Sequence, residues 1–377
     1  MTARKRSIRR PWVGSHAGCV RSANPRAVEG ATSAGAGTVR AVRDWLVAAD
    51  DRTGAFEVAG LLARVVGPVR VTVGEACAGN GVVDLESRAL SLAEASVMAA
   101  AVEGTPSVWS AHKIDSTLRG NWAGELLARQ AVSGRRVVVL PGWPELGRTC
   151  VDGIVRVHGE SIGRPADHLP GADELSDAAA LRNWLSSTRS IAICDLPDDD
   201  AMNSLADALC GADVLVAGPG GPLGAAFAAR SSAPTAPPLL PSFGDAIAVV
   251  CGSANSVSHE QLRRLAIARP DITVISTSST DGELQADVAK ALAERAARRL
   301  NDLQPDTLVV IGGDTAAALL GGTPRLVGGL IAPGMPWSRG ENDRGPLVVT
   351  KAGGFGGPDA LVDLLRGETV SVNEVST

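Results

Sequence analysis

The chain has 377 residues, of which 45% are hydrophobic and 20% are charged, and its formal net charge is −5. This length allows two domains, because single hydrophobic cores rarely grow beyond about 250–300 residues. The composition is typical of a globular protein, and the negative charge argues against a general nucleic-acid binder. The six cysteines show no Cys-x-x-Cys spacing and no Cys/His cluster, which argues against a zinc site and against a disulfide framework.

Residues 1–43 form a basic segment that we expect to be a disordered extension. No apolar stretch of about 7–15 residues follows its basic start, so the pattern does not indicate a secretory signal. No later segment approaches the roughly 20 apolar residues of a membrane span. We therefore expect a cytoplasmic protein whose partners include neither a membrane nor a nucleic acid.

From residue 44 onward, short apolar runs alternate with longer helical patterns. Such alternation is typical of parallel sheets with helices on both faces. Strands are predicted at Leu46–Ala49, Val69–Val73, Val137–Leu140, Ile191–Cys194 and Val214–Ala217, and helices at Trp122–Val132 and Asp199–Cys210.

A proline- and serine-rich segment, residues 231–244, interrupts this pattern and is interpreted as an interdomain linker. The pattern then resumes with strands at Ile247–Cys251, Ile272–Ile275, Leu308–Ile311 and Leu347–Thr350, and with helices at Leu284–Leu300 and Pro358–Leu365. We predict an α/β fold of two domains with mainly parallel sheets, residues 44–230 and 245–377. The active site is expected in the interdomain cleft, because ligands of such sheets gather beyond the carboxyl ends of the strands.

Two adjacent carboxylates, Asp50 and Asp51, follow the first predicted strand and precede a helix. Such a pair can supply a general base or hold Mg²⁺, whereas the structural alternative is that one of them only caps the helix. A second polar segment, residues 84–88, places Arg88 after an apolar run. A further segment, Pro141–Thr149, places Arg148 after the strand at Val137–Leu140.

The densest polar segment is residues 112–121, which we interpret as a substrate-binding loop. Lys113 and Arg119 can hold an anionic group, since arginine binds a carboxylate or a phosphoryl group through two hydrogen bonds. Ser116, Thr117 and Asn121 can hydrogen-bond the hydroxyls of a sugar. A loop without a function would gain nothing from so many polar groups.

Three glycine-rich turns in the C-terminal part each follow a predicted strand and precede a helix: Cys251–Ser256, Ile311–Thr315 and Lys351–Gly357. Backbone N–H groups at helix N-termini can bind phosphate, and glycine lets the main chain approach it closely. Lys351 can neutralise charge that develops during phosphoryl transfer. A Walker A loop is absent, and one such turn alone is usually structural, but three in one small domain indicate a nucleotide site.

These segments occur in the order and spacing of one family. The motifs Ala49-Asp50-Asp51-x-Thr53-Gly54, Ser87-Arg88, Lys113-x-Asp115-Ser116-Thr117-Leu118-Arg119-Gly120-Asn121 and Pro141-x-x-Pro144-x-x-Gly147-Arg148 resemble those of the four-carbon acid sugar kinases. Members of that family phosphorylate threonate, erythronate or 3-oxo-tetronate. The resemblance extends from about residue 45 to the end of the chain.

The resemblance implies transfer of the γ-phosphoryl group from MgATP to a hydroxyl of a small sugar acid. The expected catalytic residue is Asp51 or Asp50, with Asp115 as the other candidate. The expected substrate-binding residues are Arg88, Lys113, Asp115, Ser116, Arg119 and Asn121. The expected ATP-binding residues are Ser253, Gly312, Gly313, Asp314, Thr315, Lys351, Gly353 and Gly354. A protein-derived metal site is not identified, and a homodimer is left open.

Three positions depart from the family pattern. Arg52 stands where an apolar residue is usual, His112 replaces a second lysine, and Gly354 replaces an asparagine. They keep one alternative open, a non-catalytic ligand- or nucleotide-binding protein derived from the same fold. A second alternative, a dinucleotide-dependent dehydrogenase, is disfavoured because no Gly-x-Gly-x-x-Gly motif follows the first strand.

Overall fold

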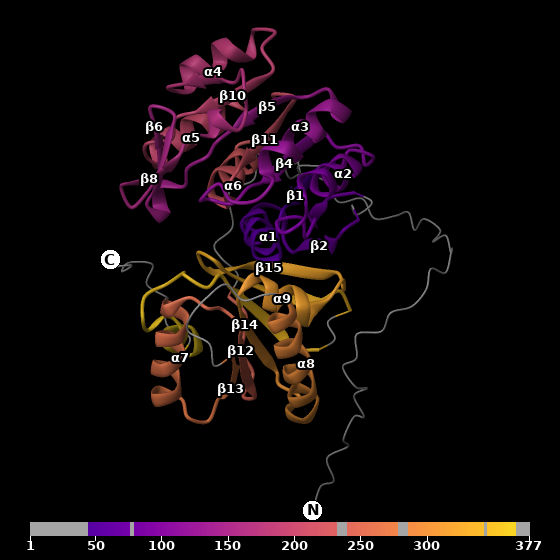
Figure 1. Cartoon of the computed structure of the whole chain (residues 1–377), viewed down its shortest axis with the longest axis vertical. Helices are drawn as coiled ribbons and strands as arrows, with labels where there is room; N and C mark the ends of the chain where they lie inside the picture. The colour runs from indigo at the N-terminus through magenta and orange to yellow at the C-terminus, as the bar shows by residue number, and fades with distance from the viewer. Residues whose placement is uncertain (1–43, 76–78, 232–239, 278–285, 343–344, 367–377) are drawn as a thin grey trace, which may run out of the picture.

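The computed structural model describes residues 44–75, 79–231, 240–277, 286–342 and 345–366. They form an upper half, residues 44–231, and a lower half, residues 240–366, as oriented in Figure 1. The predicted extension, residues 1–43, lies outside the described residues, as do residues 232–239 of the predicted linker.

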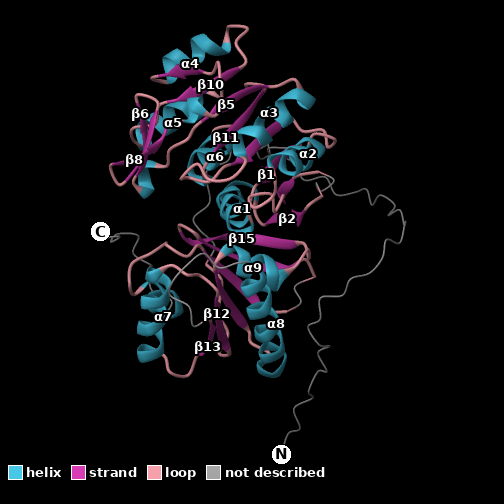
Figure 2. Cartoon of the chain, in the orientation of Figure 1, coloured by secondary structure: helices cyan, strands magenta, loops and turns pink. Residues whose placement is uncertain are grey.

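The upper half is built on eight parallel strands in the order β2-β3-β1-β4-β11-β5-β10-β9. Figure 2 shows helices and strands intermingled in both halves. The strands are β1 (Trp45–Ala49), β2 (Val69–Val73), β3 (Gly81–Asp84), β4 (Trp109–Lys113), β5 (Arg136–Val139), β9 (Asp173–Leu175), β10 (Ile191–Cys194) and β11 (Val214–Gly218). The helices are α1 (Arg52–Val66), α2 (Leu92–Val102), α3 (Trp122–Ser133), α4 (Ala178–Leu185), α5 (Asp199–Ala208) and α6 (Gly220–Ala228). A small antiparallel sheet consists of β6 (Arg148–Val151), β7 (Ile154–Val157) and β8 (Glu160–Gly163).

The lower half has four parallel strands, in the order β13-β12-β14-β17, followed by an antiparallel pair, β16 and β15. The strands are β12 (Ile247–Cys251), β13 (Thr273–Ser276), β14 (Thr307–Ile311), β15 (Arg325–Ala332), β16 (Met335–Gly340) and β17 (Leu347–Lys351). The helices are α7 (Ser256–Ala268), α8 (Ala286–Leu303), α9 (Gly313–Leu320) and α10 (Ala360–Arg366). The α/β class with mainly parallel strands is therefore confirmed.

One sheet runs through both halves, because β15 pairs antiparallel with β2. Helix α1 of the upper half also packs on β15, and Gly60 permits the close approach. A Cβ at Gly60 would lie 2.6 Å from Leu330 Cδ2 and 3.1 Å from the carbonyl carbon of Gly329. The largest core cluster accordingly includes side chains of both halves, such as Val47 and Val310. The halves are joined by packing as well as by the chain.

Alternate side chains of the buried strands face different helices, which explains their continuous apolar runs. On β1, Val47 and Ala49 belong to the core cluster that contains α1, whereas Leu46 and Ala48 pack with α2 residues such as Ala99. The predicted strands at 191–194 and 247–251 have the predicted bounds. The predicted helix at 284–300 is observed from residue 286, and residue 284 lies outside the described part of the chain.

Candidate functional site

A group of acidic and basic residues of the upper half lies at the carboxyl ends of three adjacent parallel strands, β3, β1 and β4. Asp50 and Asp51 follow β1, Asp84 ends β3, and Lys113 ends β4. Because parallel strands end at the same edge of a sheet, residues far apart in sequence become neighbours there. His112 and Lys113 belong to this strand end and not, as the sequence suggested, to the following loop.

Asp50 is fully buried and binds Arg88 through two hydrogen bonds. Arg88 Nε lies 2.8 Å from Asp50 Oδ2, and Arg88 Nη2 lies 2.9 Å from Asp50 Oδ1. Burial raises the pKa of Asp50 to about 6, although the Arg88 charge opposes this shift. A Cβ at Gly120 would lie 3.2 Å from Asp50 Oδ2, so the glycine, at φ 84°, leaves room beside this pair. The geometry is that of an anchored guanidinium.

Asp51 caps α1, which is the structural alternative drawn from the sequence, and its other oxygen contacts Arg88. Its Oδ1 accepts a hydrogen bond of 2.8 Å from Gly54 N, and its Oδ2 accepts one of 2.7 Å from Thr53 Oγ1. Arg88 Nη1 also donates to Oδ2, at 2.9 Å. Burial alone would raise the pKa of Asp51, but the charges of Arg88 and Lys113 and these hydrogen bonds outweigh it and lower the pKa.

Asp115 is held by its own turn. Arg119 Nε and Nη2 donate to it at 3.0 and 2.9 Å, and Thr117 N donates at 3.0 Å. Burial opposes ionisation, yet the Arg119 hydrogen bonds and the Arg88 charge hold the pKa of Asp115 well below its usual range. The Ser116 hydroxyl is half-buried and makes no hydrogen bond with the described residues.

Asn121 supports the site and does not reach into it. Its Nδ2 donates to the carbonyl oxygens of Ser87 and Leu90, at 3.3 and 2.9 Å, and so fixes the segment that carries Arg88. His112 contributes to the same support: its Nε2 lies 2.9 Å from Glu125 Oε2, and Ser87 Oγ donates to Glu125 Oε1 at 2.5 Å. The substitution of His112 for a lysine is thus matched by a buried carboxylate.

Lys113 is buried at the centre of the site, and its partner is a residue that the sequence did not reveal. Lys113 Nζ donates to Ile114 O at 2.9 Å and lies 3.7 Å from Glu57 Oε2. Burial raises the pKa of Glu57, and the Lys113 charge opposes this shift. Glu57 lies four residues after Thr53 in α1, which is the spacing of one helix face, so helical periodicity could have identified it.

In the lower half, the three glycine-rich turns converge. A Cβ at Gly353 would lie 2.3 Å from Ser253 Oγ, and a Cβ at Gly312 would lie 3.4 Å from Ser253 N and 3.3 Å from Thr315 Oγ1. Gly312 has φ 105° and opens α9 without a side-chain cap, so the first N–H groups of α9 remain available to a ligand. Gly354 and Asp314 are exposed beside these turns.

Lys351 lies beneath the last turn and is fully buried. Its Nζ donates to the carbonyl oxygens of Ala352 and Gly353, both at 3.0 Å. Burial lowers the pKa of Lys351 to about 7. In this position, Lys351 supports the backbone of the turn.

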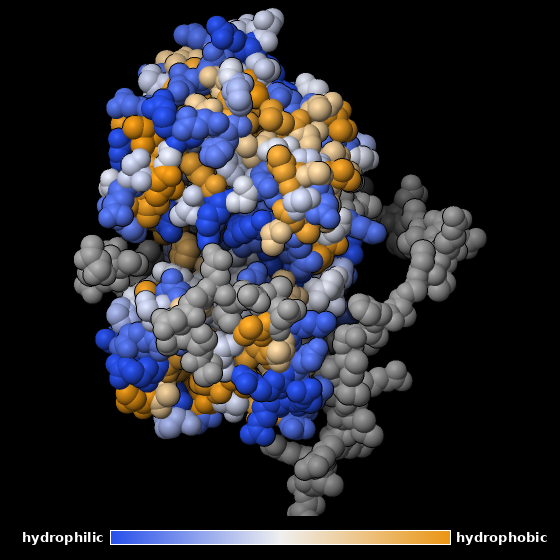
Figure 3. All heavy atoms as spheres, in the orientation of Figure 1, coloured by the Kyte–Doolittle hydropathy of each residue, from blue (hydrophilic) through white to orange (hydrophobic). Residues whose placement is uncertain are grey.

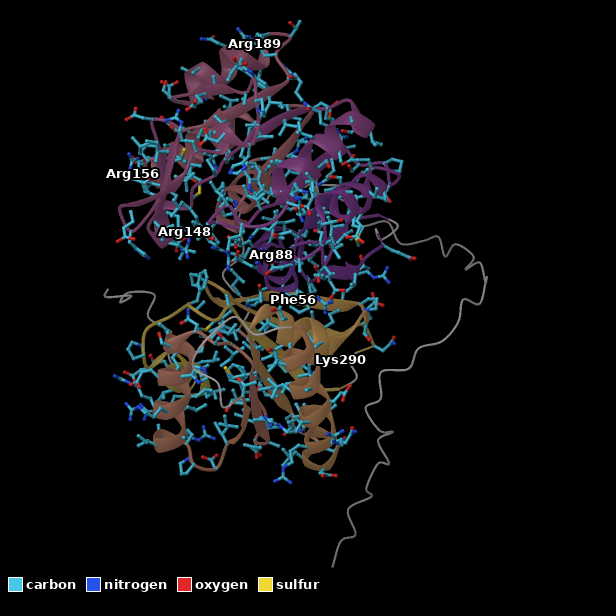
Figure 4. The ribbon with its side chains drawn as sticks, viewed as in Figure 1. Phe56, Arg88, Arg148, Arg156, Arg189 and Lys290 are labelled. Atoms are coloured by element: carbon cyan, nitrogen blue, oxygen red, sulfur yellow. The ribbon has the colours of Figure 1, made fainter. Side chains whose placement is uncertain are left out.

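The polar cluster and the glycine-rich turns face each other. A Cβ at Gly313 would lie 3.4 Å from Asp51 Oδ2 and 3.4 Å from Thr53 Oγ1, so the N-termini of α1 and α9 meet. Arg88 and Arg148 both lie toward the boundary between the halves (Figure 4). On the face shown in Figure 3, hydrophilic residues border this boundary.

The described residues contain no group of three or more His, Cys, Asp or Glu side chains suited to a metal ion. Within the same ranges, none of the helices has the length and apolar character that crossing a membrane requires.

The fold and the two facing sides define an α/β protein that brings a cluster of charged side chains next to glycine-lined helix N-termini. Comparison with known proteins finds one matching domain family within each half. Residues 45–170 match a sugar-binding N-terminal domain, and residues 266–361 match a nucleotide-binding C-terminal domain. The chain belongs to the four-carbon acid sugar kinase family.

Two curated relatives are D-threonate kinases. The one from Cupriavidus necator is 34% identical over 128 residues, which span 31% of each chain. The one from Bordetella bronchiseptica is 27% identical over an alignment of 399 residues that covers 84% of this chain and 95% of the relative.

Two solved structures share the fold. The Haemophilus influenzae protein HI1011 has a TM-score of 0.61 at 18% identity and covers 86% of this chain and 100% of its own. A Salmonella typhimurium LT2 protein described as a tRNA synthase has a TM-score of 0.66 at 19% identity, over 86% of this chain and 98% of its own.

Proposed function

We propose that the protein is an ATP-dependent kinase that phosphorylates a hydroxyl of a small, four-carbon sugar acid. The observation that carries the proposal is the contact between Gly313 and Asp51, which brings the glycine-rich turns of one half against the carboxylate of the other. Phosphoryl transfer depends mainly on positioning and on charge stabilisation, and both sides supply groups for that purpose. The names of the two curated relatives favour a four-carbon acid such as threonate.

Asp51 is the best candidate for the residue that orients the acceptor hydroxyl and takes its proton. Asp50 has no exposed surface and both of its oxygens bind Arg88, whereas Asp115 is held by Arg119 and Thr117. Asp51 retains 18% of its side-chain surface and lies nearest the nucleotide turns. In the proposed step, the hydroxyl oxygen bonds to the γ-phosphorus, its proton passes to Asp51, and ADP leaves with the electrons of the broken P–O bond.

The anionic end of the acceptor has two cationic partners in this arrangement. Arg119 exposes 67% of its side chain, and its two side-chain hydrogen bonds both go to Asp115, so the rest of the guanidinium remains accessible to a carboxylate. Lys113 adds a buried positive charge at the end of β4. The Ser116 hydroxyl, which has no partner among the described residues, is suited to a substrate hydroxyl.

Asp314 is the carboxylate beside the glycine-rich turns that would hold Mg²⁺, because Mg²⁺ is usually held by one or two carboxylates together with substrate phosphates. Asp314 is exposed in the first turn of α9, and Asp51 approaches the residue before it. When bound with ATP, the ion neutralises charge on the phosphates.

An assay of ADP formation with ATP and a panel of threonates, erythronates and 3-oxo-tetronate tests the proposal. We expect turnover with at least one acid and none without an acid. Thermal stabilisation by ATP without turnover on any acid would favour the non-catalytic alternative.

A further inference from the structure

Arg148 occupies a loop whose backbone is fixed independently of any ligand. The loop joins β5 to β6 and is closed by two hydrogen bonds, from Trp143 N to Arg148 O at 2.6 Å and from Arg148 N to Trp143 O at 3.2 Å. Gly147 has φ 67°, and a Cβ there would lie 2.5 Å from His158 Nδ1, so only glycine fits before Arg148. The position of Arg148 is therefore built into the fold.

The guanidinium of Arg148 has no counter-ion within the described part of the chain. Its Nη1 donates to Leu146 O at 3.0 Å, and its Nε is buried without a hydrogen-bond partner. Among the residues that the structure describes, no carboxylate forms an ion pair with it. The other arginines near the site differ: Arg88 pairs with Asp50 and Asp51, and Arg119 pairs with Asp115.

Two acidic residues influence Arg148 from a distance, but both have closer cations. Burial lowers the pKa of Arg148, and the charges of Glu57 and Asp115 partly offset that effect. Glu57 lies nearer to Lys113, and Asp115 is bound by Arg119. A half-buried cation without an ion pair is unfavourable, so an anionic ligand would be attracted to this position.

Arg148 belongs to the upper half but faces a nucleotide turn of the lower half. Its Cζ lies 5.2 Å from the centroid of the Phe355 ring. Phe355 is part of the turn that contains Gly353, and Gln261 Nε2 donates to its carbonyl oxygen at 3.1 Å. Figure 4 shows Arg148 at the lower edge of the upper half.

We propose that Arg148 binds the terminal phosphate of the nucleotide from across the boundary between the halves and stabilises it during transfer to the acceptor. This inference rests on the proposed kinase function and adds a residue to it. Arginines that reach a transferring phosphoryl group from a neighbouring element stabilise the charge spread over its oxygens. A planar guanidinium is well suited to binding two such oxygens.

The test compares Arg148→Ala and Arg148→Lys with the control Arg189→Ala. Arg189 is exposed on the upper half and pairs with Asp173, far from the lower half (Figure 4). We expect Arg148→Ala to lower kcat by about 100-fold or more, with the KM for the acid changing by less than about threefold. Arg148→Lys should be intermediate, because it restores the charge but not the two-point geometry. Arg189→Ala should match the parent protein.

A binding measurement needs no acceptor and separates this inference from the proposed function. ATP should raise Tm more than ADP does in the parent protein, and this difference should disappear in Arg148→Ala. If Arg148→Ala has a lower Tm than the parent protein without ligand, the ATP–ADP difference in Tm is measured in Arg148→Lys instead. An unchanged ATP–ADP difference in the variants, or a raised KM for the acid at unchanged kcat, would overturn the inference. A parent protein that distinguishes ATP from ADP through Arg148 but phosphorylates no acid would contradict the proposed function alone.

Discussion

Arg52 Nη1 donates a hydrogen bond of 3.0 Å to the carbonyl oxygen of Gly321, the residue that caps the C-terminus of α9. Asp51, its neighbour in sequence, lies against Gly313 at the start of the same helix. Two adjacent residues of the upper half therefore contact opposite ends of α9, and a cation at a helix C-terminus is favourable. In the family pattern, an apolar residue is usual at position 52. The contact of Arg52 with the C-terminal end of α9 explains why a positive charge is favourable there.

Arg52→Met should destabilise the protein by about 3–5 kcal/mol, because it leaves Asp84 buried without its cation. Arg52 Nε lies 2.5 Å from Asp84 Oδ2, and both side chains are buried. Urea unfolding measures the effect. The matched control is Arg70→Met, which removes an exposed ion pair with Glu341 between the same halves and should cost less than about 1 kcal/mol. Equal losses in the two variants would contradict the buried-pair interpretation.

Asp51→Asn should lower kcat by about 100- to 10,000-fold while leaving Tm nearly unchanged. Asparagine caps helices about as well as aspartate, so α1 keeps its cap. The substitution removes the proposed base and the ion pair with Arg88, which stays paired with Asp50. Steady-state kinetics and a melting curve provide the two readouts. Asp177→Asn is the control, since Asp177 caps α4 in the same way, through Ala180 N at 2.8 Å. Full turnover in Asp51→Asn would exclude this residue as the proton acceptor.

Asp50 makes stability depend on pH in a defined direction. Its pKa is raised from 3.8 to about 6, so its contribution is fully present below about pH 3.8 and is lost as the pH rises through 6. This loss amounts to roughly 3 kcal/mol at most, since one pKa unit corresponds to about 1.4 kcal/mol. The variant Asp50→Asn has no titrating carboxyl at this position, so it does not lose stability in this way as the pH rises. Its stability relative to the parent protein should therefore improve between pH 4 and pH 7.5, as followed by urea unfolding across that range, and a constant difference would refute the shift.

Lys351 should couple nucleotide binding to proton uptake. Its pKa is lowered to about 7, so its stabilising contribution is present at high pH and is lost as the pH falls through 7. A phosphate nearby favours the charged form, so ATP binding at pH 8 should take up a proton, and affinity should fall between pH 7 and pH 9.

Calorimetry in buffers of different ionisation enthalpy measures this uptake. Lys351→Met should abolish it, whereas Lys290→Met, at an exposed position of α8, should preserve it. Equal uptake in both variants would assign the proton to another group.

The sequence predicted the strands that are apolar throughout, because a strand buried on both faces has no polar alternation. It missed β4, whose residues Ser110, His112 and Lys113 are polar and yet buried. Their burial is offset by distant partners: Arg129 binds Ser110 Oγ, and Glu125 binds His112. Such compensation depends on α3, and no local pattern reveals it. The sequence also missed the antiparallel pair β15–β16, whose pairing partners lie in both halves.

By itself, the sequence determined the α/β class, the polar residues after β1 and β4, and the glycine-rich turns, because each of these depends on short-range patterns. Only the tertiary structure decided which of these groups already make hydrogen bonds within the protein. Asp50 binds Arg88, Asn121 binds the backbone of Ser87, and Lys351 binds the backbone of its own turn. It also decided that Glu57 joins the site, that Arg148 has no counter-ion among the described residues, and that Gly313 meets Asp51. The last of these brings the two halves together, as does the pairing of β2 with β15, which joins segments more than 250 residues apart, Val71 and Arg325 among them.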